Sequence, residues 1–283
     1  MKTRGWFRRL ALFFGFAFLY LPILSMIVYS FNNSRLVTVW DADDSPTLKW
    51  YRALFNNEQI LGAALLSVKV AAVTATGAVI LGTLAGLVLA RFGPFKGRTL
   101  LAGMTTAPLV MPEVITGLSL LLLFVSLEQL IGWPQGRGFA TIVIAHVTFA
   151  MAYVTVVVQS RLASFDDSLE EAALDLGARP AKVFYRITLP LILPAIVSGW
   201  LLAFTLSWDD VVISQFVAGP GSTTLPMVIF SKVRLGVSPD INALATIMVG
   251  IVGLGVVLSA LWMRRKERQL ALEMQLAKAD KGR

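Results

Sequence analysis

Six long apolar stretches constrain the fold of this chain more than any other feature of its 283 residues. A helix that crosses the hydrocarbon core of a membrane needs about 20 consecutive apolar residues. The six stretches are residues 10–31, 61–90, 99–127, 139–160, 191–216 and 243–263. Because 56% of the residues are hydrophobic and only 15% are charged, the composition excludes an ordinary soluble domain. The sequence therefore predicts an all-α, polytopic membrane protein with six transmembrane helices.

Basic residues cluster at alternate ends of these spans, and their distribution predicts the orientation of the chain. They precede the first span and follow the second, fourth and sixth, whereas the first connection is acidic, with Asp41, Asp43, Asp44 and Glu58. By the positive-inside rule, both termini and the polar segment after the fourth span lie in the cytoplasm. The net charge of +8 is explained in this way without a nucleic-acid partner.

The same pattern predicts three parts of the chain. Residues 1–60 hold the first transmembrane helix and an external loop, residues 61–263 form a transmembrane core with a polar loop at about 161–190, and residues 264–283 form a cytoplasmic tail. The basic start of the chain also resembles a signal peptide. Its apolar run is longer than usual and no convincing cleavage site follows, so we interpret it as an uncleaved first span.

The polar segment between the fourth and fifth spans carries signals for two short helices. Ser168 and Glu171 fit a capping box, which predicts a helix that begins near Leu169. Gly177 can adopt the left-handed conformation that ends a helix, and Pro180 suits the first position of a second one. One face of the first helix combines large and small apolar side chains, so that a partner could approach closely: Leu169, Ala172, Ala173 and Leu176.

The full order of residues in this segment resembles the cytoplasmic EAA loop of permease subunits of type I ABC importers. Glu171, Ala172 and Ala173 are followed by Gly177 and then by the Ile-x-Leu-Pro run of residues 187–190. The resemblance implies the six-helix permease fold known as MetI-like, and a coupling helix that sits in a groove of an ATPase subunit. A capped helical hairpin that merely ties two spans together would explain Ser168 and Gly177, but not the whole pattern.

Four charged residues lie inside the predicted spans, where they are costly and usually face a cavity or a partner: Lys69, Glu113, Asp209 and Asp210. Glu113 follows the helix-breaking Pro112 and could line a translocation path, as interrupted helices do in transporters. It could equally pair with Lys69, or stabilise the start of a half-helix through the helix dipole.

Trp208, Asp209 and Asp210 are the candidates for contact with a cationic cargo. Two adjacent carboxylates resist desolvation unless a cation lies near them, and an indole ring can contact a cation through its face. Alternatively, the two acids lie at the water boundary or cap the segment that follows. The single histidine, His146, has no cysteine or second histidine near it to complete a metal site, so we predict a hydrogen-bonded packing role for it and no metal.

Further segments resemble the permeases of the putrescine/spermidine importer family, and within it most of all the second permease of putrescine-specific systems. They are residues 107–117, 207–212, 219–226, 238–239 and 241–246. Trp208, Asp209, Asp210 and Glu113 stay candidates for the substrate pathway on the grounds of their chemistry, and the position of Trp208 varies within the family. The resemblance implies a homologous permease as partner, two copies of a cytoplasmic ATPase, a periplasmic solute-binding protein and a polyamine cargo, in the bacterial inner membrane.

The sequence also limits the chemistry of the chain itself. Residues 93–99 hold a glycine, a lysine and a threonine, but not in the spacing of a phosphate-binding Walker A loop. No nucleophile, base and orienting group occur at a recognisable spacing, so catalytic residues are not expected. We therefore expect no cofactor on this chain, with ATP and Mg²⁺ held by the partner ATPase. The alternatives are an ABC permease for another solute such as ferric iron, and a transporter driven by an ion gradient.

Overall fold

The computed structural model describes residues 3–36, 39–164, 166, 168–236, 238–255, 257 and 261. All elements assigned in this part of the chain are helices. The chain divides into two compact units, one of residues 59–231 and one of residues 1–58 and 232–283. The tail predicted at 264–283 lies outside the described residues, and the predicted three-part division stays a prediction.

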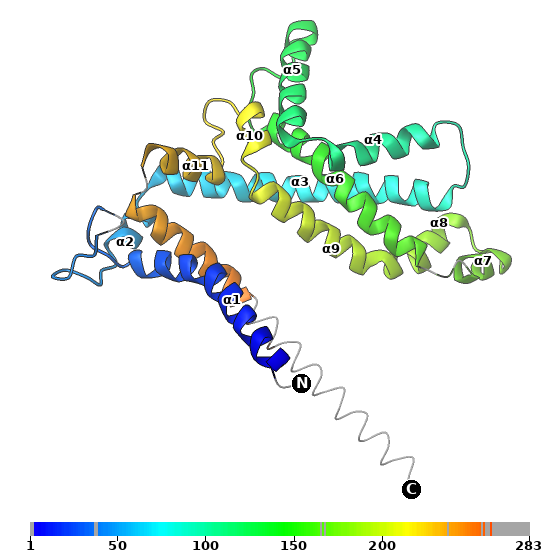
Figure 1. Ribbon diagram of the computed structural model, residues 1–283. Helices are drawn as coiled ribbons and strands as arrows, with labels where there is room; N and C mark the ends of the chain where they lie inside the picture. Colours follow the sequence, from blue (N-terminus) through cyan, green and yellow to red (C-terminus); the bar gives the residue numbers. More distant parts are fainter. Residues whose placement is uncertain are drawn as a thin grey trace. The chain divides into compact units, whose positions relative to one another are not determined.

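The larger unit is built almost entirely from helices (Figure 1). They are α3 (Glu58–Arg91), α4 (Arg98–Val110), α5 (Glu113–Ile131), α6 (Phe139–Ala163), α7 (Ser168–Asp175), α8 (Pro180–Val183), the π-helix η1 (Phe184–Thr188), α9 (Leu189–Trp208), α10 (Val212–Val217) and α11 (Leu225–Leu235). Helix α3 begins one residue before this unit and α11 runs on beyond it. The short helices α7 and α8 form a hairpin where α6 ends and α9 begins.

Two of the predicted continuous spans are interrupted. The stretch at 99–127 is divided into α4 and α5, because Met111 is extended (φ −74°, ψ 134°) and Pro112 follows it. A residue before proline is driven out of the helical region, so the break falls where the sequence predicted a half-helix to begin. The stretch at 191–216, which the sequence predicts as one span, is divided at residues 209–211 into α9 and α10.

Helices α3, α6 and α9 pack closely because glycines leave room between them. An added Cβ atom at Gly82 would lie 2.8 Å from Val154 of α6 and 2.9 Å from a carbonyl oxygen of the same helix. Gly86 faces Val158 in the same way, and Gly199 of α9 also faces Val154. These glycines therefore allow close packing of helices within this chain.

A second core joins α5, α6 and α10. Phe124, Ile142 and Ile213 are fully or almost fully buried in it. Gly117 of α5 lies against the ring of Phe216, so that α10 packs directly on α5. The Thr141 hydroxyl of α6 donates a hydrogen bond to the carbonyl oxygen of Val217 (2.7 Å), which fixes the end of α10.

The other unit contains α1 (Thr3–Tyr29), α2 (Lys49–Phe55) and the apolar helix Pro239–Gly255. Its loop after α1 is organised by the buried Asn32, which donates to the carbonyl oxygen of Val39 (2.6 Å) and accepts from the amide of Asp41 (2.9 Å). The indole of Trp50 donates to the carbonyl oxygen of Asn32 (2.7 Å) and so ties α2 to the same loop.

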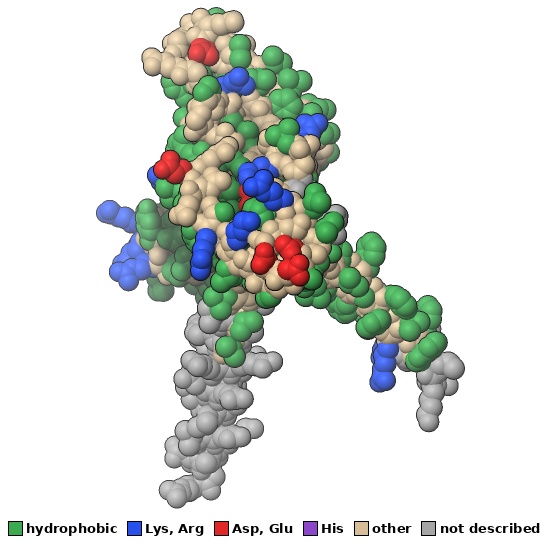
Figure 2. Space-filling view, turned by 90° about the vertical axis from the view of Figure 1, so that its left-hand side faces the viewer, with side chains coloured by type: hydrophobic (Ala, Val, Ile, Leu, Met, Phe, Trp, Pro, Cys, Tyr) green, Lys and Arg blue, Asp and Glu red, His purple; other side chains and the backbone are tan. Residues whose placement is uncertain are grey.

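The lengths and compositions of these helices agree with a membrane protein. Five helices of the described residues are long and apolar enough to cross a membrane, and Pro239–Gly255 is a shorter apolar helix. Figure 2 shows a face on which hydrophobic side chains cover wide areas while charged side chains gather in a few clusters. The orientation with both termini in the cytoplasm stays a prediction.

Candidate functional site

The first candidate site is the hairpin of α7 and α8. Local sequence signals determine where α7 ends and where α8 begins. Gly177 has φ +81°, in the left-handed region. Its amide donates to the carbonyl oxygen of Leu174 (2.9 Å), and the amide of Ala178 donates to that of Ala173 (3.0 Å). These are the two bonds of a Schellman motif. Pro180 opens α8, as predicted.

The start of α7 differs in detail from the predicted capping box. The helix begins at Ser168, and the amide of Ser168 donates to Oδ1 of Asp166 (3.0 Å). Hydrogen bonds from the amide and hydroxyl of Ser168 hold the pKa of Asp166 below its ordinary value of 3.8. Among the described residues, the side-chain acceptor at this end of α7 is thus Asp166, and a carboxylate there is also favoured by the helix dipole.

The predicted partner face of α7 is open to the surroundings. Leu169 is 52% exposed and Leu176 is 89% exposed. Ala172 between them is exposed and Ala173 is half-buried. Large apolar side chains left uncovered on a short polar hairpin mark a surface that another protein can cover.

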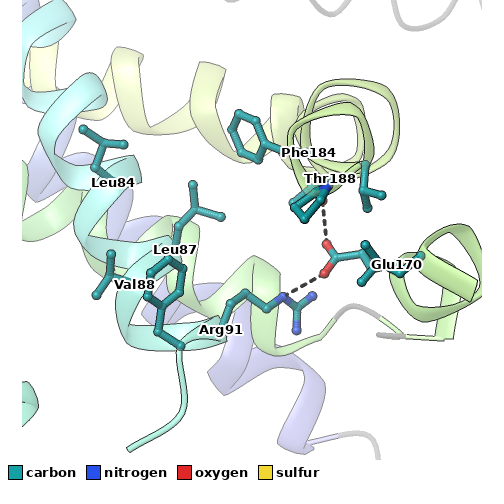
Figure 3. A pocket seen from close by; sticks show the side chains of 11 residues that line it. Leu84, Leu87, Val88, Arg91, Glu170, Phe184 and Thr188 are labelled. Carbon is teal, nitrogen blue, oxygen red and sulfur yellow. Dashed lines mark hydrogen bonds and ion pairs between the residues drawn. The ribbon is translucent and has the colours of Figure 1, made fainter. Parts of the chain in front are cut away.

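Glu170, the neighbour of the predicted Glu171, connects this hairpin to the membrane helices (Figure 3). Its Oε1 accepts a hydrogen bond from the Thr188 hydroxyl (2.6 Å), and its Oε2 lies 3.5 Å from Nε of Arg91, the last residue of α3. Glu171 is exposed. Sequence reasoning missed Glu170, Arg91 and Thr188, because nothing in the order of residues shows that these three meet.

The second candidate site lies at the other end of α9, where Asp210 holds the break in the helix. Its carboxylate accepts from the amides of Ile213 (3.2 Å) and Ser214 (2.7 Å), so that it caps α10. Its Oδ2 also lies 3.1 Å from Nε2 of His146 in α6. Nδ1 of His146 lies 2.8 Å from the Ser207 hydroxyl.

These contacts give His146 and Asp210 a structural role. Both side chains are almost inaccessible, at 2% and 6% exposed. The hydrogen-bonded packing role predicted for His146 is confirmed, and the alternative in which an acid caps the following segment describes Asp210. Within the described residues, no group of three or more metal-binding side chains comes together.

Asp209 and Trp208 differ from Asp210 in their surroundings. Asp209 is exposed at the end of α9, while Trp208 is half-buried and its ring stacks on that of Phe204 (centroids 6.0 Å apart). The structure thus brings one exposed carboxylate and one buried carboxylate to this point. Asp209 is available to a ligand, and the part that all three residues play toward a cargo stays a prediction.

Glu113 begins α5 directly after Pro112 and is exposed. Lys69 is exposed on α3, and among the described residues no ion pair joins it to Glu113. The position of Glu113 agrees with one of the alternatives left by the sequence, in which its negative charge stabilises the N-terminus of α5. Its place beside a translocation path stays a prediction.

Comparison with known proteins relates this chain to a family of transport proteins. Residues 79–271 match the family described as "Binding-protein-dependent transport system inner membrane component". The chain is 56% identical over 276 residues to the putrescine transport system permease protein PotI of Escherichia coli strain K12, an alignment that covers 98% of this chain and 97% of the relative.

A second relative and a solved structure extend this comparison. The spermidine/putrescine transport system permease protein PotC of Haemophilus influenzae is 43% identical, with 93% of this chain and 98% of the relative covered. The crystal structure of a bacterial ABC transporter involved in the import of the acidic polysaccharide alginate has a TM-score of 0.71 at 15% identity, with 92% of this chain and 95% of that chain covered. That structure supports the fold alone.

Proposed function

This chain belongs to the family of binding-protein-dependent transport system inner membrane components, and on that premise we propose that it moves a polyamine inward as the permease subunit of an ABC importer. The observation that carries the proposal is the identity of 56% over almost the whole chain to a putrescine permease. Identity to a spermidine/putrescine permease is lower, at 43%, which favours putrescine as cargo.

The proposed assembly contains a second permease, a periplasmic solute-binding protein and two copies of an ATPase in the cytoplasm. The family description supports dependence on a binding protein. The absence of Walker A spacing in the sequence supports ATP hydrolysis on another subunit, with ATP and Mg²⁺ bound there. The uncovered apolar face of α7 supports docking of that subunit on the hairpin.

The two candidate sites lie at opposite ends of α9, and this arrangement suggests how they act together. A helix of 20 residues is about 30 Å long, close to the thickness of the hydrocarbon core. Closure of the ATPases would move the α7–α8 hairpin at one end of α9. Asp209 at the other end would then become accessible in turn from one side of the membrane and from the other. This is the alternating-access mechanism.

In this proposal the exposed carboxylate of Asp209 binds one ammonium group of the cargo, and the aromatic face of Trp208 lies beside that group. Glu113 contributes negative charge along the pathway. Asp210 keeps the break between α9 and α10 in place, and so positions Asp209. Glu171, Ala172, Ala173 and Gly177 form the surface that the ATPase contacts.

Uptake of labelled putrescine by cells or proteoliposomes that carry the whole complex tests both sites. Asp209→Asn should raise the putrescine concentration at half-maximal uptake, because a charge pair with the cargo is lost. Gly177→Val should lower uptake while ATP hydrolysis continues, because a left-handed β-branched residue distorts the end of α7. Unchanged affinity in Asp209→Asn would refute the cargo assignment, and full uptake in Gly177→Val would refute the coupling role.

A further inference from the structure

We propose that Glu170 links α7 to the end of α3 and to Thr188, and so carries a movement of the α7–α8 hairpin to α3, so that it is a positioning residue for transport. The inference rests on the proposed function, because it assigns a route to the movement that an ATPase would impose on the hairpin. It concerns a different carboxylate from Glu171, which is exposed on the same helix.

Helix α7 has little apolar attachment to the membrane helices. None of its eight residues, all of which the structure describes, is buried. A cavity of about 390 Å³ lies between α3, the hairpin and η1 (Figure 3). Its walls are mostly apolar, with Leu84 and Leu87 on α3, Leu174 on α7 and Phe184 on η1. Helix α7 is therefore not joined to α3 by close apolar packing, whereas α8 continues through η1 into α9.

The carboxylate of Glu170 spans the gap instead. One oxygen accepts the Thr188 hydroxyl at 2.6 Å, and the other faces Nε of Arg91 at 3.5 Å. The side chains of Glu170 and Arg91 are each only 18% exposed. Hydrogen bonds and ion pairs of charged groups that are shielded from water are stronger and less screened by salt than those on the surface.

Each partner of Glu170 lies at the end of a long element. Arg91 is the last residue of α3, which has 34 residues. Thr188 is the last residue of the π-helix η1 and directly precedes α9. Because π-helical turns are frequent at functional sites, the turn at residues 184–188 fits a role in directing the buried Thr188 toward Glu170. One carboxylate thus links α7 both to the end of α3 and to the residue that directly precedes α9.

The test uses the complex of all subunits in proteoliposomes and measures putrescine uptake and ATP hydrolysis together. Glu170→Gln keeps an oxygen for Thr188 but removes the charge that faces Arg91. We expect the number of putrescine molecules imported per ATP to fall about ten-fold, in line with the loss of one interaction of a charged group. Asp175→Asn is the matched control, since it removes an exposed carboxylate from the same helix and should leave the ratio unchanged.

Exchange of the two charges, with Arg91→Glu and Glu170→Arg in one chain, should recover a large part of the uptake per ATP. If the contacts of Glu170 only stabilise the fold, Glu170→Gln will lower the unfolding temperature without changing the number of putrescine molecules imported per ATP. A Glu170→Gln complex that unfolds earlier but imports with the wild-type ratio would therefore overturn the proposal. If Glu170→Gln prevents assembly, Thr188→Val removes only one of the two links, and an unchanged ratio in that variant would likewise overturn it.

Comparison with Gly177→Val separates this inference from the proposed function. If Gly177→Val uncouples ATP hydrolysis from uptake while Glu170→Gln does not, the hairpin still couples hydrolysis to uptake. Glu170 then does not carry the movement of the hairpin to α3. If neither variant uncouples the complex, the coupling role of the hairpin itself is wrong.

Discussion

Replacement of Asp210 by alanine should destabilise the folded chain, whereas the same replacement at the adjacent Asp209 should not. The two residues have the same chemistry and are neighbours in sequence, so they form a matched pair. They differ in their contacts, because Asp210 accepts two backbone amides of α10 and lies beside His146, while Asp209 is exposed.

The size of the effect follows from the contacts of Asp210. Loss of a capping carboxylate at the start of a helix costs about 1 kcal/mol. The Asp210 carboxylate is also one of two partners of Nε2 of the buried His146, beside the Ser214 hydroxyl, and loss of a buried hydrogen bond to a charged group costs roughly 1–3 kcal/mol more. We therefore expect Asp210→Ala to lower the free energy of unfolding by about 2–4 kcal/mol, and Asp209→Ala to change it by less than about 0.5 kcal/mol.

Thermal unfolding of the purified complex in lipid nanodiscs, followed for both variants under one set of conditions, checks this difference. Asp210→Ala should unfold at a clearly lower temperature than the wild type, and Asp209→Ala at nearly the same temperature. Equal unfolding temperatures for Asp210→Ala and the wild type would refute the structural role of Asp210. A large loss of stability in Asp209→Ala would refute the division of roles between the two acids.

Two further predictions concern packing and the loop after α1. Gly82→Ala should lower the unfolding temperature by crowding Val154, at a cost of roughly 1–3 kcal/mol in the free energy of unfolding. Gly62 lies on the same helix and faces open space, so Gly62→Ala should be neutral or stabilising. Equal effects of the two substitutions would contradict the close packing of α3 on α6. Asn32→Ala should leave the amide of Asp41 without its acceptor and loosen the loop, so that limited proteolysis cuts residues 31–48 faster than in the wild type; an unchanged cleavage rate would contradict this role.

The helical spans could be predicted from the sequence because they depend on local composition. The boundary at Pro112 could also be predicted, since proline restricts the residue before it whatever the tertiary structure. The ends of α7 and the start of α8 followed from Gly177 and Pro180 for the same reason. These features need only information from residues a few positions apart.

The break between α9 and α10 could not be predicted in this way. Residues 209–211 contain no proline or glycine, and Asp210, which caps α10, contacts His146, which lies 64 positions away in sequence. The sequence likewise could not show whether Glu170 or Glu171 contacts the membrane helices. Both are glutamates in the first turn of α7, and only the fold shows which of them meets Arg91 and Thr188.

If this chain imports a polyamine only when an ATPase docks on its hairpin, reconstitution of the complete complex and of the chain alone will distinguish the two cases. Accumulation of labelled putrescine should be measured in liposomes that hold either the complete complex or this chain alone, with ATP on the ATPase side and the binding protein opposite. We predict accumulation by the complete complex with ATP, and none by the chain alone under an ion gradient. Gradient-driven accumulation by the chain alone would contradict the account.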